Sequence, residues 1–406
     1  MCLFFREPPA NVDPKARMNH RIAMWLCIWL VGGNMPSQVM PPFRAEHIGS
    51  LLRPQALLGE RAKFVRGEID AATLGKAEDE AIKDALLLQE RIGFAFATDG
   101  EFRRRSYHSY FYGRLGDVRI DTVAGEEAGA GTPGQRAAQP VALIGSRIRW
   151  QEPINVPDFQ FIKAHTSLVP KITIPGPCAL HFRGGDAAVL ASAYRDLDQF
   201  WDDTVVAFGQ ELDALAAAGC RYIQIDETAF AKFGDPDVQA QLKARGDDWS
   251  ALIDMYIAVT NRILKNAPRE MRIGMHLCRG NRGGQWHAEG SYDEVAERLF
   301  NALNIAFYFL EYDSPRAGTF AALRLVPGHK TVVLGVVSTK TPAMERKDQL
   351  KRRIDDAAKH IELDRVAVSP QCGFASLDTG NPISAEVQEQ KLRLVVELAR
   401  EVWAEA

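Results

Sequence analysis

Several features that mark other protein classes are scarce in this chain of 406 residues. Its six cysteines are too few and too widely spaced for a disulfide framework, so we predict reduced thiols and a cytoplasmic location. The formal net charge of −3, without a basic cluster, argues against binding to nucleic acid or to an anionic membrane. No internal repeat or low-complexity tract is evident, which excludes a repeat architecture.

Long hydrophobic runs are also missing, and the most apolar stretch, at 24–31, is too short to span a bilayer as a helix. Basic residues precede it, as in a signal peptide. The competing interpretation is an upstream start codon, with translation beginning at Met35 or Met40, and we favour it because the later sequence has a cytoplasmic character. Residues 1–40 are therefore predicted to be a disordered or mis-assigned extension, and no membrane segment is expected.

Short apolar runs alternate with helix-period segments from residue 43 onward, which is typical of a parallel sheet with crossover helices. Eight strands are predicted, at 43–51, 94–99, 171–176, 222–227, 272–278, 306–313, 331–337 and 365–371. Helices are predicted at 77–92, 197–218, 249–266, 291–303, 345–361 and 384–404. Eight strands are the number that a (β/α)₈ TIM barrel requires.

One segment interrupts this alternation. Residues 101–170 contain a stretch rich in Gly, Ala and Pro at 124–139 and are predicted to form a hairpin around 141–164. We interpret them as an insertion of hairpin and loop after the second strand. Residues 41–406 are accordingly predicted to be a single TIM-barrel catalytic domain.

Polar residues of chemical interest follow five of the predicted strands, where barrel enzymes place their active sites. His276 and Cys278 stand two residues apart on an extended segment, so their side chains point the same way. Cys372 lies between Pro370 and Gly373, and Glu311 ends an apolar strand. Each residue alone is compatible with a buried cysteine, a core histidine or a solvated carboxylate, but together they predict a zinc site.

The composition of that set favours one kind of chemistry. Zinc with two thiolates, one carboxylate and one neutral histidine carries a formal charge of about −1, which makes it a poor activator of water. Such a centre suits a substrate thiol, which it would hold as a thiolate nucleophile. We expect the carboxylate, as the weakest ligand, to yield when the substrate sulfur arrives.

Five segments, in the same order, resemble the catalytic barrel of cobalamin-independent methionine synthase and its short bacterial relatives: 44–54, 98–104, 223–227, 276–278 and 369–373. The resemblance covers about residues 43–400. It implies zinc bound by His276, Cys278, Glu311 and Cys372. It also implies that Ser50 holds the amino-acid carboxylate of the substrate and that Glu101 and Asp226 grip its ammonium group. The implied reaction is methyl transfer from 5-methyltetrahydropteroyltriglutamate to homocysteine.

Three departures from the family put the folate donor in question. The chain has room for one barrel, whereas the long enzymes have two. Segment 335–342 lacks the family's histidine and carries Lys340, and segment 176–182 has His181 and Phe182 where a tryptophan is expected to stack on the pterin. The two arginines of the glycine-rich segment 279–284 are candidates for binding an anion.

Other functions remain open from the sequence. One is epoxyalkane:coenzyme M transfer or another zinc-thiolate alkyl transfer with a non-folate donor. An acid pair that grips ammonium favours an amino-acid thiol instead, since coenzyme M has no ammonium group. A metallohydrolase is disfavoured by the two cysteines, and a purely structural zinc site by the absence of Cys-x-x-Cys spacing. The alkyl donor and a homo-oligomeric state are not determined.

Overall fold

The computed structural model describes residues 41–116, 118–123 and 139–403, and the described residues from Arg44 onward form one compact unit. Its strands are β1 (Phe96–Ala97), β2 (Val118–Val123), β3 (Gln139–Ile144), β4 (Val169–Pro170), β5 (Ile172–Pro175), β6 (Tyr222–Glu227), β7 (Arg272–Leu277), β8 (Phe307–Glu311), β9 (Thr331–Val337) and β10 (Val366–Pro370). The prediction for residues 1–40 lies outside the described residues, as does most of the Gly-, Ala- and Pro-rich stretch.

Twelve helices and four 3₁₀ turns are found within the described ranges. The helices are α2 (Gln55–Val65), α3 (Ala71–Ile92), α4 (Ser109–Tyr112), α5 (Val156–His165), α6 (Ala179–Phe182), α7 (Gly185–Leu190), α8 (Leu197–Ala218), α9 (Pro236–Arg245), α10 (Trp249–Leu264), α11 (Asp293–Ala302), α12 (Lys347–Ala357) and α13 (Ala385–Val402). The 3₁₀ turns are η1 (Phe230–Gly234), η2 (Pro315–Ala317), η3 (Phe320–Leu325) and η4 (Leu363–Arg365). None of the described helices is long and apolar enough to cross a bilayer.

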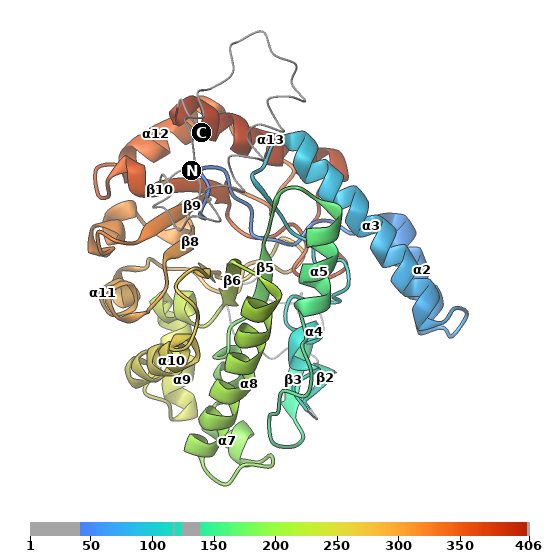
Figure 1. Ribbon diagram of the computed structural model, residues 1–406. Coiled ribbons are helices and arrows are strands. Elements are labelled where there is room, and N and C mark those ends of the chain that lie inside the picture. Colours follow the sequence, from blue (N-terminus) through green and yellow to red (C-terminus); the bar gives the residue numbers. More distant parts are fainter. Residues whose placement is uncertain (1–40, 117, 124–138, 404–406) are drawn as a thin grey trace, which may run out of the picture. The chain divides into compact units, whose positions relative to one another are not determined.

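A six-stranded, all-parallel sheet in the order β10-β9-β8-β7-β6-β5 forms the centre of this unit. Its strands are buried almost throughout, which explains their continuous apolar runs. Figure 1 shows α8, α10, α11, α12 and α13 on the outside of these strands. The predicted parallel α/β fold is confirmed.

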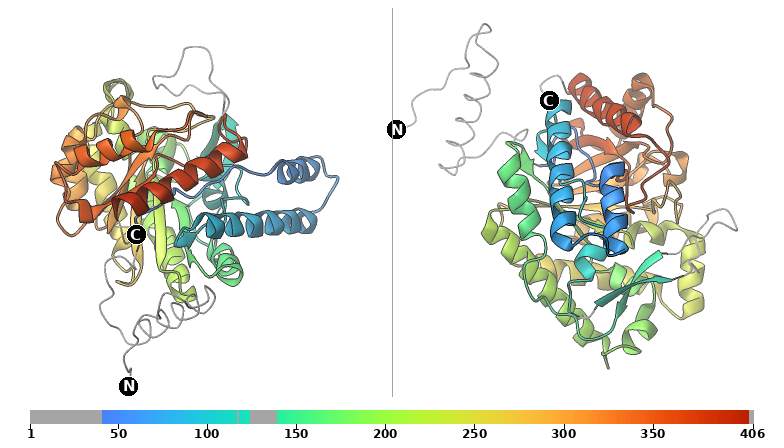
Figure 2. Two further views of the ribbon diagram at one scale, coloured as in Figure 1. Left: turned by 90° about the horizontal axis from the view of Figure 1, so that it is seen from above. Right: turned by 90° about the vertical axis from the view of Figure 1, so that its right-hand side faces the viewer.

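The six predicted helices are all confirmed, with ends that differ by a few residues. Side-chain hydrogen bonds cap the first turns of several helices. At the start of α8, Asp196 accepts a hydrogen bond from the Gln199 amide at 2.7 Å, and at the start of α13, Ser384 accepts one from the Val387 amide. Six further helices were not predicted: α2, α4, α5, α6, α7 and α9. Helices α2 and α3 lie side by side (Figure 2).

The first two predicted strands are much shorter than expected. Of residues 43–51, only Ala45 forms a bridge, to Val368 of β10, and β1 pairs only with β4. Beyond β1, the side chain of Gln89 accepts the hydrogen bond of the Thr98 amide at 2.9 Å, so side chains replace the strand ladder. The described residues thus show a six-stranded parallel sheet and the short parallel pair β1–β4, besides the antiparallel pair β2–β3. Closure into an eight-stranded barrel stays a prediction.

The predicted insertion contains a hairpin, but at a different place. Strands β2 and β3 pair in antiparallel fashion, whereas residues 156–164 of the predicted hairpin belong to helix α5. Pro157 lies in the first turn of α5, where a missing backbone N–H costs nothing. The prediction of a hairpin extending to residue 164 was therefore wrong, because its first strand precedes the Gly-, Ala- and Pro-rich stretch.

Candidate metal centre

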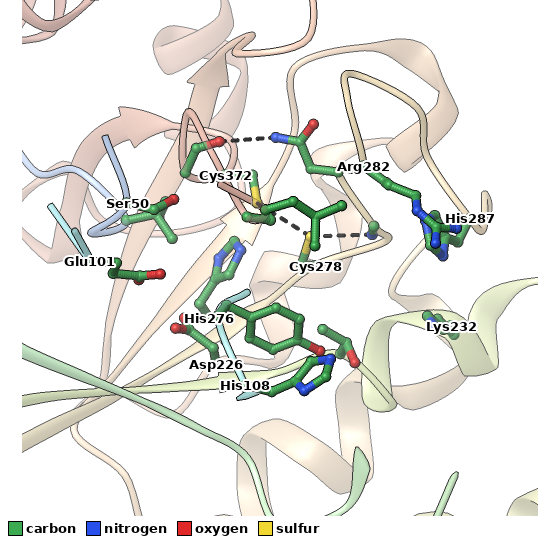
Figure 3. A pocket seen from close by; sticks show the side chains of 18 of the residues that line it. Ser50, Glu101, His108, Asp226, Lys232, His276, Cys278, Arg282, His287 and Cys372 are labelled. Atoms are coloured by element: carbon green, nitrogen blue, oxygen red, sulfur yellow. Dashed lines mark hydrogen bonds between the residues drawn. The ribbon is translucent and has the colours of Figure 1, made fainter. Parts of the chain in front are cut away.

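Three side chains from two distant parts of the chain converge at the carboxyl ends of the strands. His276 and Cys278 lie at the end of β7, and Cys372 follows β10. One ligand atom from each of the three residues lies within 4.8 Å of the other two, and all three are buried. The two sulfur atoms are 3.5 Å apart, and Figure 3 shows the three side chains facing a common point.

These residues fit zinc. Two sulfurs bound to one tetrahedral zinc at about 2.3 Å lie roughly 3.7 Å apart, close to the observed separation. Both ring nitrogens of His276 are buried and make no hydrogen bond with the described residues. A hydrogen bond with Cys372, together with burial, raises the pKa of the Cys278 thiol well above its usual value. A nearby cation is therefore needed to hold the sulfur of Cys278 as a thiolate at neutral pH.

Glu311, the predicted fourth ligand, lies outside this group of three. Its fully buried carboxylate ends β8 and accepts hydrogen bonds from Arg316, from Lys340 at 2.9 Å and from the Arg279 amide at 2.9 Å. Burial alone would raise the pKa of Glu311, but these positive partners lower it to about 2. The structure brings together three of the four predicted ligands and places the fourth in an ion-pair cluster.

Two carboxylates line the pocket that contains the metal ligands. Asp226, at the end of β6, accepts a hydrogen bond from Gln224 at 2.6 Å, and burial raises its pKa to about 7. Glu101 follows β1 with a left-handed φ of 61°, and Thr173 donates a hydrogen bond to its Oε1 at 3.0 Å. The other oxygen, Oε2, is buried and makes no hydrogen bond with the described residues. A buried, partnerless carboxylate oxygen facing a pocket suits a cationic group of a ligand.

Ser50 lies on the same side of the pocket as Glu101 (Figure 3). The hydroxyl of Ser50 packs so closely on Gly373 that a β-carbon at that glycine would come within 1.9 Å of it. Only glycine therefore allows the loop that carries Cys372 to pass beside Ser50. The three residues predicted to hold the amino-acid substrate, Ser50, Glu101 and Asp226, all line this pocket.

Basic and aromatic residues complete the pocket wall, and most of them were not predicted from the sequence. The unpredicted side chains are Tyr107, His108, Arg183, Lys232 and His287. They lie on loops, helix ends or a 3₁₀ turn, where no period or motif singles them out. In the view of Figure 3, Lys232, Arg282 and His287 lie on the side of the metal ligands opposite Ser50 and Glu101.

The remaining candidates divide between pocket and core. Of the two arginines in the glycine-rich segment, Arg282 lines the pocket, whereas Arg279 is buried over the ring of Tyr292 at 4.1 Å. His181 forms hydrogen bonds with Tyr256 and Asp186, both at 2.8 Å, and does not line the pocket. His181 thus has a core role, and a stacking platform for a donor is not found there.

Comparison with known proteins points in one direction. The family described as cobalamin-independent synthase, catalytic domain, matches residues 43–401. The uncharacterized protein YxjG of Bacillus subtilis is 36% identical over 366 residues, which cover 89% of this chain and 95% of that protein. The methionine synthase of Pyrococcus furiosus is 22% identical over 373 residues, or 90% of this chain and 94% of that protein.

A solved structure from Listeria monocytogenes, described as a candidate vitamin-B12-independent methionine synthase, has the same fold. It superposes with a TM-score of 0.68 at 32% identity and covers 89% of this chain and 98% of that one.

Proposed function

The chain belongs to the family of cobalamin-independent synthase catalytic domains, and from that premise we propose that it is a zinc-dependent methyltransferase that methylates the sulfur of homocysteine. One observation carries the proposal: a zinc-type ligand set and a buried carboxylate oxygen, Oε2 of Glu101, that has no hydrogen-bond partner among the described residues line the same pocket. The first suits a thiol and the second an ammonium group, and homocysteine carries both.

The metal ligands in this proposal are His276, Cys278 and Cys372. Zinc bound there would lower the pKa of a substrate thiol so that it is present as a thiolate at neutral pH. Because hydrolytic zinc sites are normally rich in histidine, two cysteines favour sulfur chemistry over the activation of water.

The pocket residues orient the amino acid. Glu101 and Asp226 accept hydrogen bonds from the ammonium group, and the Ser50 hydroxyl donates to the carboxylate. Held at three points, the substrate directs its sulfur toward Cys278 and Cys372, which line the same pocket. Fixing the sulfur in line with the donor's methyl group supplies much of the rate, since oriented reactants have effective concentrations far above those in solution.

The transfer itself is a displacement at carbon. The thiol loses its proton to solvent, its sulfur forms a bond to the methyl carbon, and the bond between methyl and donor breaks. The electron pair of that bond leaves with the donor.

The proposal extends to the architecture. Ala45, β1, the β4–β5 segment and β6 to β10 occupy eight successive strand positions, with Ala45 bridged to β10. We propose that these positions form the predicted closed (β/α)₈ barrel, which would gather the carboxyl ends of its strands around one pocket.

A product assay tests the function and identifies the donor. Zinc-loaded protein with homocysteine is offered methyltetrahydropteroyltriglutamate or methylcobalamin, and methionine is measured by mass spectrometry. Production of methionine that requires zinc supports the proposal. If homocysteine yields no methionine but 2-mercaptoethanesulfonate forms a thioether with a small epoxide, the chain is a coenzyme M alkyltransferase instead.

A further inference from the structure

The carboxylate of Glu311 is held in a buried cluster of charged side chains beside the metal ligands. Lys340 and Arg316 donate to its Oε1, and the Arg279 amide donates to its Oε2. Within the cluster Asp313 is the second acid, 3.7 Å from both Lys340 and Arg316, and it accepts a hydrogen bond from Ser338 at 2.8 Å. Two acids thus face these two cations, and the buried guanidinium of Arg279, which donates to the backbone oxygen of Glu311 at 3.3 Å, adds a third positive charge.

The cluster is anchored to the loops around it, so moving its side chains would cost free energy. Arg316 also donates to the backbone oxygen of Ala288 at 3.0 Å and lies over the ring of Trp286, with 5.0 Å to the ring centroid. The side chains of Arg316 and Lys340 are only 8% and 6% exposed. If Glu311 turned away to bind a metal, Asp313 would be the single close carboxylate left for these two buried cations. Leaving buried charges without a full set of partners costs free energy.

We propose that Lys340 and Arg316 hold Glu311 away from the metal, so that His276, Cys278 and Cys372 are the whole protein ligand set of the resting enzyme. This inference rests on the proposed zinc centre and deepens it. The fourth coordination position is then open to the substrate thiol, as is usual for catalytic zinc with three protein ligands. Lys340 and Glu311 become positioning residues rather than ligands.

The arrangement changes how the thiol enters. No carboxylate has to leave the metal before the sulfur binds. Zinc with two thiolates and one neutral histidine has a formal charge of about zero, one unit more positive than with Glu311 bound. A less negative centre attracts an incoming thiolate more strongly, so Lys340 becomes a determinant of thiol affinity.

Metal affinity of matched variants tests the proposal without relying on turnover. Zinc and cobalt affinities are measured by chelator competition, and homocysteine binding is followed through the absorption of the cobalt-loaded protein. We expect Glu311→Gln to change the metal affinity less than about 100-fold, because outer partners influence affinity less than direct ligands do. Lys340→Met frees Glu311 to become a fourth ligand, so metal affinity should rise and homocysteine affinity should fall by about tenfold.

Two controls separate this effect from misfolding. Lys340→Arg keeps the charge and the hydrogen bond to Glu311, and should bind metal and homocysteine like the parent protein. In the double variant with Glu311→Gln and Lys340→Met, residue 311 carries no carboxylate that could bind the metal. This variant should therefore have the parental homocysteine affinity.

The opposite results would overturn the inference. A loss of about 100-fold or more in metal affinity on Glu311→Gln would make Glu311 a direct ligand. Unchanged metal and homocysteine affinities in Lys340→Met would show that Lys340 does not keep Glu311 away from the metal. If Cys372→Ser keeps its zinc, the metal centre itself is wrong. If Cys372→Ser and Glu311→Gln both lose zinc, the function stands and only this inference fails.

Discussion

Replacing Cys372 by serine removes one of the three side chains that converge at the metal centre. The sulfur of Cys372 lies 3.5 Å from that of Cys278, and the ligand atoms of both residues lie within 4.8 Å of that of His276. A serine hydroxyl in this place is shorter, harder and not ionised at neutral pH, so it is a poor zinc ligand. We expect zinc to be lost while the fold is kept, because the parallel sheet does not depend on this loop.

The magnitude follows from the energetics of zinc sites. Four-ligand sites bind zinc with about 10–16 kcal/mol at neutral pH, or roughly 2.5–4 kcal/mol for each ligand. Losing one ligand should therefore weaken binding by two to three powers of ten, since about 1.4 kcal/mol corresponds to a factor of ten. The assay is competition with a coloured chelator, together with the zinc content of dialysed protein.

A second buried cysteine provides the control. Cys220 is fully buried, its sulfur lies 3.6 Å from the backbone oxygen of Tyr222, and it does not line the pocket. Cys220→Ser should carry a similar cost for placing a hydroxyl in the interior and still bind zinc like the parent. If Cys372→Ser kept its full zinc content after dialysis, or if Cys220→Ser lost zinc equally, the ligand assignment would be refuted.

Three further predictions concern the substrate side and the fold. Glu101→Gln should weaken homocysteine binding by about 10–100-fold, because a hydrogen bond between charged groups is lost. Binding of 4-mercaptobutanoate, which lacks the amine, should not change. Calorimetry measures the affinities of both thiols, and an equal loss for the two would mean that Glu101 acts only on the fold. Gly373→Ala should displace the Ser50 hydroxyl, which a β-carbon would approach within 1.9 Å, and raise the KM for homocysteine; an unchanged KM would show that Ser50 does not contact substrate. Burial raises the pKa of Asp158 to about 7, so the folded state binds this proton more tightly than the unfolded chain. Relative to Asp158→Asn, the parent protein should gain about 2–3 kcal/mol of unfolding free energy as the pH falls from about 8 to 5; urea titrations that show no such gain would contradict the assignment.

Periodicity and strand-end chemistry by themselves determined a large part of this protein. Apolar strands and amphipathic helices carry their period locally, so the helices from α8 to α13 that the alternation predicts were located within a few residues. His276 and Cys278 were recognisable because alternate residues of one strand share a face. Metal-binding side chains, together with a motif order that resembles a known family, made the zinc set a prediction from residues alone.

Tertiary structure decided what no local pattern encodes. That Cys372 meets Cys278 across 94 positions of sequence depends on the parallel order of the strands. The partners of Glu311 come from three separate loops, so its ion pairs with Lys340 and Arg316 had no sequence signal. Strands 43–51 and 94–99 were overestimated because hydrogen bonds from side chains such as Gln89 replace the ladder there. Local sequence sets which side chains point inward, but the charges that each one finally meets are set by how distant segments pack.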